Sequence, residues 1–292
     1  MRGGAGSERG RHARRARVAV PPPVASRFPP ISGEVLTDRP AEGVLRLTIT
    51  NPARRNALDH AILDGIAEAL GALDDDARCV LVTGAGGMFS SGYDLGDLAE
   101  EAFADEAEQL VAHPFTAALD ALDACPVPTL AALPGHTIGG GLELALACDL
   151  RVAADGIRLG MPPAKLGLVY SHTGLRRFID AIGVPRTREL FLLGRAIDAR
   201  TALTWALVNA VVLPSDIEEE SLEWAEELAA NAPLSVRGNK RVIRELLRAR
   251  ADLDPDVERE LIELRRACFA SEDLREGVRA FAEKRPARWR GR

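Results

Sequence analysis

The stretch PGHTIGGGLELALACD, residues 134–149, decides the fold and gives the first indication of a site. Its glycines, Gly139–Gly141, let the backbone approach a ligand closely and lead into an apolar helix that begins near Leu142. The first N–H groups of a helix have no partner within it, and the helix dipole favours negative charge at that end. The stretch therefore predicts a helix start that can stabilise a developing negative charge.

Glu143 is an acid on this otherwise apolar helix, which ends near Asp149. An unpaired buried carboxylate costs several kcal/mol or becomes neutral by raising its pKa, so its presence needs a reason. Two interpretations stay open from this segment alone. Either the helix start and Glu143 form an anion site, or the glycines are only a tight turn and Glu143 caps a helix or pairs with an arginine.

Strands flank the stretch on both sides. PTLAAL (128–133) and LRVAA (150–154) predict strands, so that a strand, a glycine turn and a helix follow one another. This order places backbone N–H groups at the carboxyl end of a strand.

Further out, beyond about Gly33, strands and helices continue to alternate. VLRLTIT (44–50) and CVLVTG (79–84) predict strands on either side of an amphipathic helix over residues 59–73 that Asp59 caps. From about Asp216 onward the pattern is nearly all helical. The chain is therefore predicted to have an α/β fold that ends in a helical region.

The composition is that of an ordinary globular chain. With 292 residues, 47% of them hydrophobic and 27% charged, it can bury a large core. No apolar run approaches the roughly 20 residues that span a bilayer, so we expect a cytoplasmic protein without membrane contact. We also expect no metal site, because the histidines are scattered and the cysteines show no CxxC pairing; these cysteines are Cys79, Cys125, Cys148 and Cys268.

Residues 1–33 differ from the rest of the chain. Seven arginines against Glu8 give residues 1–30 a net charge of +6, which leaves −12 for the remainder of a chain whose total is −6. This segment is rich in Gly, Pro and Arg and lacks apolar periodicity, so we expect it to be disordered. It could be a basic arm for nucleic acid, an organelle transit peptide, or a flexible extension or misplaced start. We favour the last, so a nucleic-acid partner is not expected.

A second glycine-bearing loop, GAGGMFSSGYDLGDL, occupies residues 84–98 after a predicted strand. A dinucleotide-binding GxGxxG pattern fails because its third glycine would fall at Phe89. The residues just ahead of Asp94, where we expect a short helix that Asp94 caps, offer another backbone N–H for a ligand. Two such donors on one oxygen would form an oxyanion hole, each worth about 10²- to 10³-fold in rate.

Four segments in order resemble signatures of the crotonase superfamily, the enoyl-CoA hydratase/isomerase family. They are ITNPARRNALD (49–59), FSSGYDL (89–95), PGHTIGGGLELALACDLRVA (134–153) and SEDLREGVRAFAEKRPARW (271–289). The resemblance covers about residues 35–292. It implies an α/β crotonase (ClpP/crotonase-like) fold, a spiral of ββα repeats with a C-terminal helical trimerisation region. The implied parts are an extension (1–33), a core with the CoA-thioester site (34–215) and a helical region (216–292).

The resemblance also implies a coenzyme A thioester substrate whose carbonyl oxygen lies in an oxyanion hole. By position, the two donors are the backbone N–H groups of Tyr93 and Gly140, and Glu143 is the first catalytic glutamate. We expect no separate cofactor, because CoA is part of the substrate.

Two further pairs of residues match positions that hold CoA in the family. Arg54 and Ala57 fall in the first of the four segments, and Phe281 and Lys284 fall on a C-terminal helix that often reaches CoA from a neighbouring subunit. The implied assembly is a homotrimer or a dimer of trimers.

One departure from the family pattern bears on the chemistry. Hydratases of the family place a second glutamate twenty residues after the first, where this chain has Pro163, and the usual isomerases also rely on an acid there. Proline cannot transfer a proton, so neither mechanism fits in its ordinary form.

A subgroup of the family fits this departure. MPPAKLGLVYSHTGLRRFIDAIG (161–183) resembles the methylmalonyl-CoA decarboxylase type, which has a proline at this site and a tyrosine soon after it, here Tyr170. We expect Tyr170 to orient the carboxylate that leaves and Glu143 to shape the pocket. The subgroup has histidine where this chain has Tyr93, so either only the Tyr93 N–H matters or the substrate differs.

Three functions therefore remain open. We favour a CoA-thioester decarboxylase for a short malonyl-type acyl group, ahead of a hydratase or isomerase with a substitute acid, and ahead of a non-catalytic CoA- or RNA-binding relative. Tyr170 could instead be a core aromatic residue. We expect His136 and His172 to be solvated or structural, and Arg176 and Arg177 to be surface charges.

Overall fold

The structure is a computed structural model that describes residues 32–94, 111–248 and 255–290. Its strands are β1 (Glu34–Ala41), β2 (Val44–Thr50), β3 (Cys79–Gly84), β4 (Thr129–Leu133), β5 (Thr137–Ile138), β6 (Leu150–Ala154), β7 (Arg158–Gly160), β8 (Ile197–Asp198) and β9 (Ala210–Val212).

Helices connect the strands and then make up the last part of the chain. The α-helices are α1 (His60–Gly71), α3 (Thr116–Ala124), α4 (Gly140–Ala147), α5 (Pro163–Leu166), α6 (His172–Leu193), α7 (Ala199–Thr204), α8 (Ile217–Ala230), α9 (Pro233–Arg248), α10 (Pro255–Phe269) and α11 (Glu272–Ala282). Short helical turns η1 (Pro52–Arg54), η2 (Ala85–Gly87) and η3 (Val111–Phe115) complete the set.

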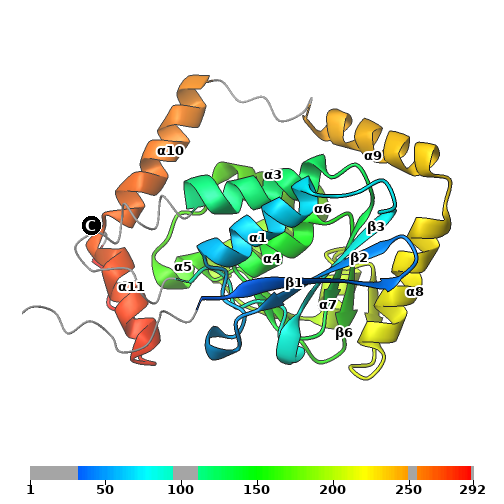
Figure 1. Ribbon diagram of the computed structural model, residues 1–292. Coiled ribbons are helices and arrows are strands. Elements are labelled where there is room, and N and C mark those ends of the chain that lie inside the picture. Colours follow the sequence, from blue (N-terminus) through cyan, green and yellow to red (C-terminus); the bar gives the residue numbers. More distant parts are fainter. Residues whose placement is uncertain (1–31, 95–110, 249–254, 291–292) are drawn as a thin grey trace, which may run out of the picture. The chain divides into compact units, whose positions relative to one another are not determined.

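The strands form a sheet in the order β1-β2-β3-β4-β6-β9 and a smaller sheet in the order β5-β7-β8. β1 pairs antiparallel with β2, and the remaining pairs of the large sheet are parallel. The central strands β3 and β4 are buried almost throughout, as parallel strands covered on both faces must be. α1 packs on β1 and β2 and α8 packs on β3 and β4, and Figure 1 shows these two helices on opposite sides of the sheet.

Most of the predicted elements are confirmed. β2, β3 and β6 have the predicted limits, β4 starts one residue late, and α1 is capped by Asp59, whose carboxylate accepts from the Ile62 N–H. The short strands β5, β7, β8 and β9 were not predicted, because two or three residues carry no readable periodicity. The extension predicted over residues 1–33 lies, as far as residue 31, outside the described residues.

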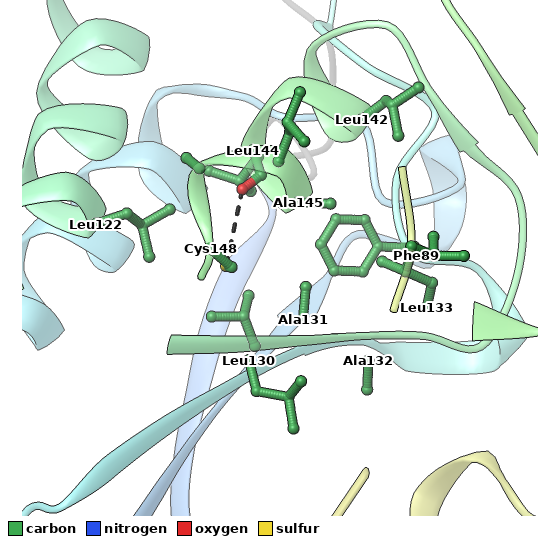
Figure 2. Close-up of a cluster of buried hydrophobic side chains, with 14 of the residues drawn as sticks. Phe89, Leu122, Leu130, Ala131, Ala132, Leu133, Leu142, Leu144, Ala145 and Cys148 are labelled. Atoms are coloured by element: carbon green, nitrogen blue, oxygen red, sulfur yellow. Dashed lines mark hydrogen bonds between the residues drawn. The ribbon is translucent and has the colours of Figure 1, made fainter. Parts of the chain in front are cut away.

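The start of α4 is held against the sheet by an apolar cluster. Figure 2 shows the Phe89 ring between β4 and α4, with Leu133 and Ala131 on one side and Leu142 and Ala145 on the other. Phe89 is fully buried. Because Phe89 belongs to the second glycine loop, its packing fixes that loop relative to the glycine turn before α4. In the described ranges, no helix has the length and apolar character needed to cross a membrane.

Replacing Phe89 by alanine should leave a cavity at this junction. We expect Phe89→Ala to lower the free energy of unfolding by about 3–5 kcal/mol in urea denaturation at fixed protein concentration. Leu192→Ala is the control, since Leu192 is 71% exposed and should change stability by less than about 0.5 kcal/mol. Equal losses in the two variants would contradict the assignment of Phe89 to the core.

Candidate functional site

The glycine turn before α4 has the conformation that the sequence predicts. Gly139 has a φ of 57° and a ψ of −129°, a backbone conformation that residues with a side chain rarely adopt. It precedes Gly140, the first residue of α4. In the part of the chain that the structure describes, the Gly140 N–H donates to no other group. The backbone N–H at this helix start is therefore available to a ligand.

The loop that carries Tyr93 lies directly against this turn. A Cβ on Gly92 would lie 3.5 Å from the Gly140 nitrogen, so the two backbones are in contact. Leu58 donates to the Gly92 carbonyl and accepts from the Asp94 N–H, which leaves the Tyr93 N–H between them directed away from Leu58. The structure thus brings Tyr93 and Gly140 together from segments 47 residues apart.

The Tyr93 side chain forms a wall over the helix start. A Cβ on Gly140 would lie 2.8 Å from Cε1 of the Tyr93 ring, which leaves room only for glycine. On its other side the ring packs edge-on against Phe115, with centroids 4.6 Å apart. The Tyr93 hydroxyl lies 3.5 Å from that of Tyr170. Tyr93 therefore joins the glycine turn to the Tyr170 side chain.

Tyr170 and Glu143 form a buried hydrogen-bonded pair. The Tyr170 hydroxyl donates to Oε2 of Glu143, and the two residues are only 8% and 1% exposed. Burial raises the pKa of Glu143, and the hydrogen bond from Tyr170 works in the opposite direction. Burial and the nearby Glu143 carboxylate raise the pKa of Tyr170 well above its usual value. Glu143 thus sits where its neutral form is favoured.

An ion pair that was not predicted from the sequence acts on Glu143. Arg177 on α6 makes two hydrogen bonds to Asp123 on α3, at 2.8 and 2.9 Å. Its charge also acts on Glu143, whose pKa it lowers. The expectation that Arg177 is a surface charge was wrong, because its partner lies 54 residues away in sequence.

Gly174 is a second residue that the sequence analysis missed. A Cβ there would lie 2.6 Å from Cε1 of Tyr170 and 2.8 Å from Oε1 of Glu143. Ser171 caps α6 by accepting from the Gly174 N–H, so the helix start is fixed beside the pair. The first turn of α6 therefore holds Tyr170 and Glu143 together.

The segment predicted to bind CoA is tied to the Tyr93 loop. Asn56 donates to the carbonyls of Ala85 and Met88, and the hydroxyl of Ser91 donates to the carbonyl of Arg54. Ala57, which follows Asn56, is 5% exposed. Arg54 and Ala57 are thus brought to the same loop as Tyr93.

Phe281 and Lys284 are not brought to this loop by any contact among the described residues. Phe281 is 69% exposed at the end of α11, and Lys284 follows with a φ of 54°. Their predicted contact with CoA from a neighbouring subunit stays a prediction.

Pro163, at the position of the family's second glutamate, is the first residue of α5 and is buried. Among the described residues, Glu143 is the one acidic residue that is buried. The site thus has a single buried acid.

Other residues that the sequence singled out have structural partners. Asp94 pairs with Arg54 at 2.7 Å, and the helix that Asp94 was expected to cap falls in residues 95–110, outside the described ranges. His172 lies 3.3 Å from Glu258, and His136 accepts from the Arg158 N–H. The four cysteines are free thiols.

Together these features define a site of a recognisable class: free backbone N–H groups at a helix start, beside a buried acid and two tyrosines. Comparison with known proteins gives the family. The model of the enoyl-CoA hydratase/isomerase family matches residues 39–292, so the chain belongs to that family and has the crotonase fold. The chain is 34% identical over 256 residues to the 2,3-dehydroadipyl-CoA hydratase of Escherichia coli K12, covering 85% of this chain and 96% of that protein.

Solved structures with the same fold include two kinds of enzyme. A methylmalonyl-CoA decarboxylase in complex with 2-nitronate-propionyl-CoA superposes with a TM-score of 0.81 at 26% identity, covering 89% of this chain and 99% of that chain. An enoyl-CoA hydratase from Bacillus anthracis superposes with a TM-score of 0.69 at 30% identity, covering 89% and 100%.

A methyl group at Gly174 should separate Tyr170 from Glu143. We expect Gly174→Ala to lower kcat/KM by about 10²-fold while the protein stays folded, because displacements near 1 Å have that effect. Gly71→Ala is the matched control, since a Cβ there meets nothing within 4 Å. Similar activity in the two variants, measured with the same acyl-CoA, would show that the pair is not needed.

The raised pKa of Glu143 has a consequence for stability. The folded chain keeps this proton at pH values where the unfolded chain releases it, so the related stability is present below the ordinary pKa of 4.5 and is lost as pH rises through the folded value. Glu143→Gln does not titrate, so its Tm relative to wild type should rise between about pH 4 and pH 8.

The control for this experiment is Glu276, whose pKa Arg285 lowers to about 2. The stability that this lowered pKa contributes is lost only as pH falls below 4.5. The Tm of Glu276→Gln should therefore differ from that of wild type by a constant amount above about pH 5.5. A pH-independent difference for Glu143→Gln as well would contradict the raised pKa.

Proposed function

We propose that the protein decarboxylates a short malonyl-type CoA thioester, such as methylmalonyl-CoA. The observation that carries this proposal is the single buried acid. Glu143 accepts a hydrogen bond from Tyr170, and Pro163 occupies the position where hydratases of the family have a second glutamate. Water addition requires one group to activate water and another to protonate carbon. Decarboxylation requires neither during bond cleavage.

The reaction needs chiefly a place for negative charge. The bond between Cα and the carboxylate breaks, its electron pair moves into the thioester carbonyl, and CO₂ leaves. The enolate oxygen then accepts from the Tyr93 and Gly140 N–H groups, whose segments are in contact. A proton from water finally bonds to Cα and gives the saturated acyl-CoA.

Tyr170 and Glu143 position the carboxylate that leaves. When Glu143 is neutral, as its burial favours, it can donate to the Tyr170 oxygen and free the Tyr170 proton for the substrate. A neutral Glu143 also does not repel an anionic acyl group. Binding of such a substrate should therefore be weaker where Glu143 ionises at high pH.

The comparisons support both the favoured function and its alternative. The decarboxylase structure has a higher TM-score than the hydratase from Bacillus anthracis, but the Escherichia coli relative is named a hydratase and is more similar in sequence than the decarboxylase. A hydratase or isomerase with a substitute acid is thus the second candidate.

We further propose a homotrimer or a dimer of trimers. α9 carries an exposed apolar face, in which Val242 is 58%, Ile243 is 59% and Leu246 is 61% exposed. Such a face on one side of a helix is typical of a surface that another subunit covers.

The test measures CO₂ release from methylmalonyl-CoA and water addition to crotonyl-CoA by the purified protein. We expect CO₂ release, and a loss of about tenfold or more in kcat/KM for Tyr170→Phe. Tyr93→Phe keeps the backbone donor and the ring, so it should change the rate less than about threefold. The hydratase alternative instead predicts water addition, abolished by Glu143→Gln and little changed by Tyr170→Phe; that result would overturn the proposal.

A further inference from the structure

The side chain of Tyr93 spans the proposed site from one end to the other. Its backbone N–H is one of the two proposed donors to the thioester oxygen. Its hydroxyl lies 3.5 Å from the hydroxyl of Tyr170, which is the group proposed to orient the carboxylate. The phenol ring connects these two ends within one residue. A thioester that reaches from the oxygen donors to Tyr170 therefore has the first carbons of its acyl group alongside this ring.

The Tyr93 ring is held in place by contacts on two sides. A Cβ on Gly140 would lie 2.8 Å from Cε1 and 3.0 Å from Cζ of the ring, so the ring touches the backbone at the start of α4. Phe115, which is 2% exposed, packs edge-on against it with an angle of 83° between the two rings. Aromatic pairs favour this geometry. Because moving the ring would break both contacts, it forms a fixed wall of the site.

This wall carries no charge at neutral pH. Burial, and then the nearby Glu143 carboxylate, raise the pKa of Tyr93 well above its usual value, and the hydrogen bond with Tyr170 works in the opposite direction. The phenol hydroxyl therefore stays protonated. The ring acts on a substrate through its shape.

We propose that the Tyr93 ring limits the size of the substituent on Cα of the acyl group, so that the site takes thioesters with a hydrogen or a methyl group there and rejects larger branches. The proposal rests on the proposed acyl-CoA site but not on decarboxylation. The decarboxylase subgroup that this chain resembles has histidine at this position, and the shorter histidine side chain would leave more room beside Cα. Tyr93 is a specificity-determining residue by this argument.

An open apolar pocket and a walled pocket respond in opposite ways to a larger acyl group. Each additional CH₂ that an apolar pocket buries strengthens binding about fourfold. Beside a fixed wall, an additional CH₂ must displace a packed ring, and such overpacking outweighs the gain from burial. The direction of the change in affinity therefore shows which kind of pocket the site has.

The experiment measures the binding of isobutyryl-CoA and 2-ethylbutyryl-CoA by calorimetry. Both thioesters are achiral and saturated, and they differ by one CH₂ on each of the two branches at Cα. We expect wild type to bind 2-ethylbutyryl-CoA about tenfold more weakly than isobutyryl-CoA. Tyr93→Leu keeps the backbone N–H but lacks the ring, so it should bind 2-ethylbutyryl-CoA at least as tightly as isobutyryl-CoA. Tyr93→Phe keeps the ring and should keep the wild-type preference.

Phe178→Leu is the matched control for a general loosening of the core. Phe178 is fully buried and packs against Phe191, with ring centroids 5.0 Å apart, so this variant should lose stability and keep the wild-type preference. Binding of isobutyryl-CoA within about threefold of wild type shows that Tyr93→Leu is folded. If Tyr93→Leu does not fold, Phe115→Leu removes the support behind the ring and should relax the preference in part.

Other outcomes would overturn the proposal. Tighter binding of 2-ethylbutyryl-CoA by wild type would mean that no wall is present, and an unchanged preference in Tyr93→Leu would place the limit at another residue. A relaxed preference in Tyr93→Phe would assign the limit to the hydroxyl, and one in Phe178→Leu would assign it to core packing. Absence of binding of either thioester would remove the acyl-CoA site itself. Because no turnover is needed, the result is independent of the CO₂ assay that tests decarboxylation.

Discussion

The close contact between the Gly92 turn and the start of α4 is the constraint on which the site depends. The backbones touch because side chains are absent: a Cβ on Gly141 would lie 2.6 Å from Cβ of Ser90, and one on Gly140 would meet the Tyr93 ring. Both segments are held from behind by Phe89, which packs between β4 and α4. The segments that carry the Tyr93 and Gly140 N–H groups are thus held in contact before any ligand arrives, and such pre-organisation is what charge stabilisation requires.

Burial of Glu143 is the second constraint, and neighbouring side chains offset the free energy that this burial costs. A carboxyl group at 1% exposure is stabilised either by becoming neutral or by hydrogen bonds and opposite charge. Tyr170 supplies the hydrogen bond, and Arg177 supplies the charge while Asp123 holds it in place. Gly174 allows the helix that carries Arg177 to come this close. The acid therefore depends on three elements, α3, α4 and α6, that fold around it.

The sequence predicts those parts of the structure that depend on local patterns. β2, β3 and β6 and the Asp59 cap follow from periodicity and capping residues, and the glycine turn follows from three consecutive glycines. The strands β5, β7 and β8 exist only through pairing with one another, so no local pattern marks them. The same holds for Arg177: its role arises from a partner 54 residues away, which spacing cannot reveal.

One physical property links the single acid to an acidic substrate. A carboxyl group whose pKa is raised by burial is a poor source of negative charge, so it does not repel an incoming carboxylate, whereas a second glutamate at the Pro163 position would. A pocket that lacks the second acid therefore places less negative charge beside an acidic acyl group than one with two ionised glutamates. In the proposed function, the change that removes water addition is therefore also the change that admits a malonyl-type acyl group.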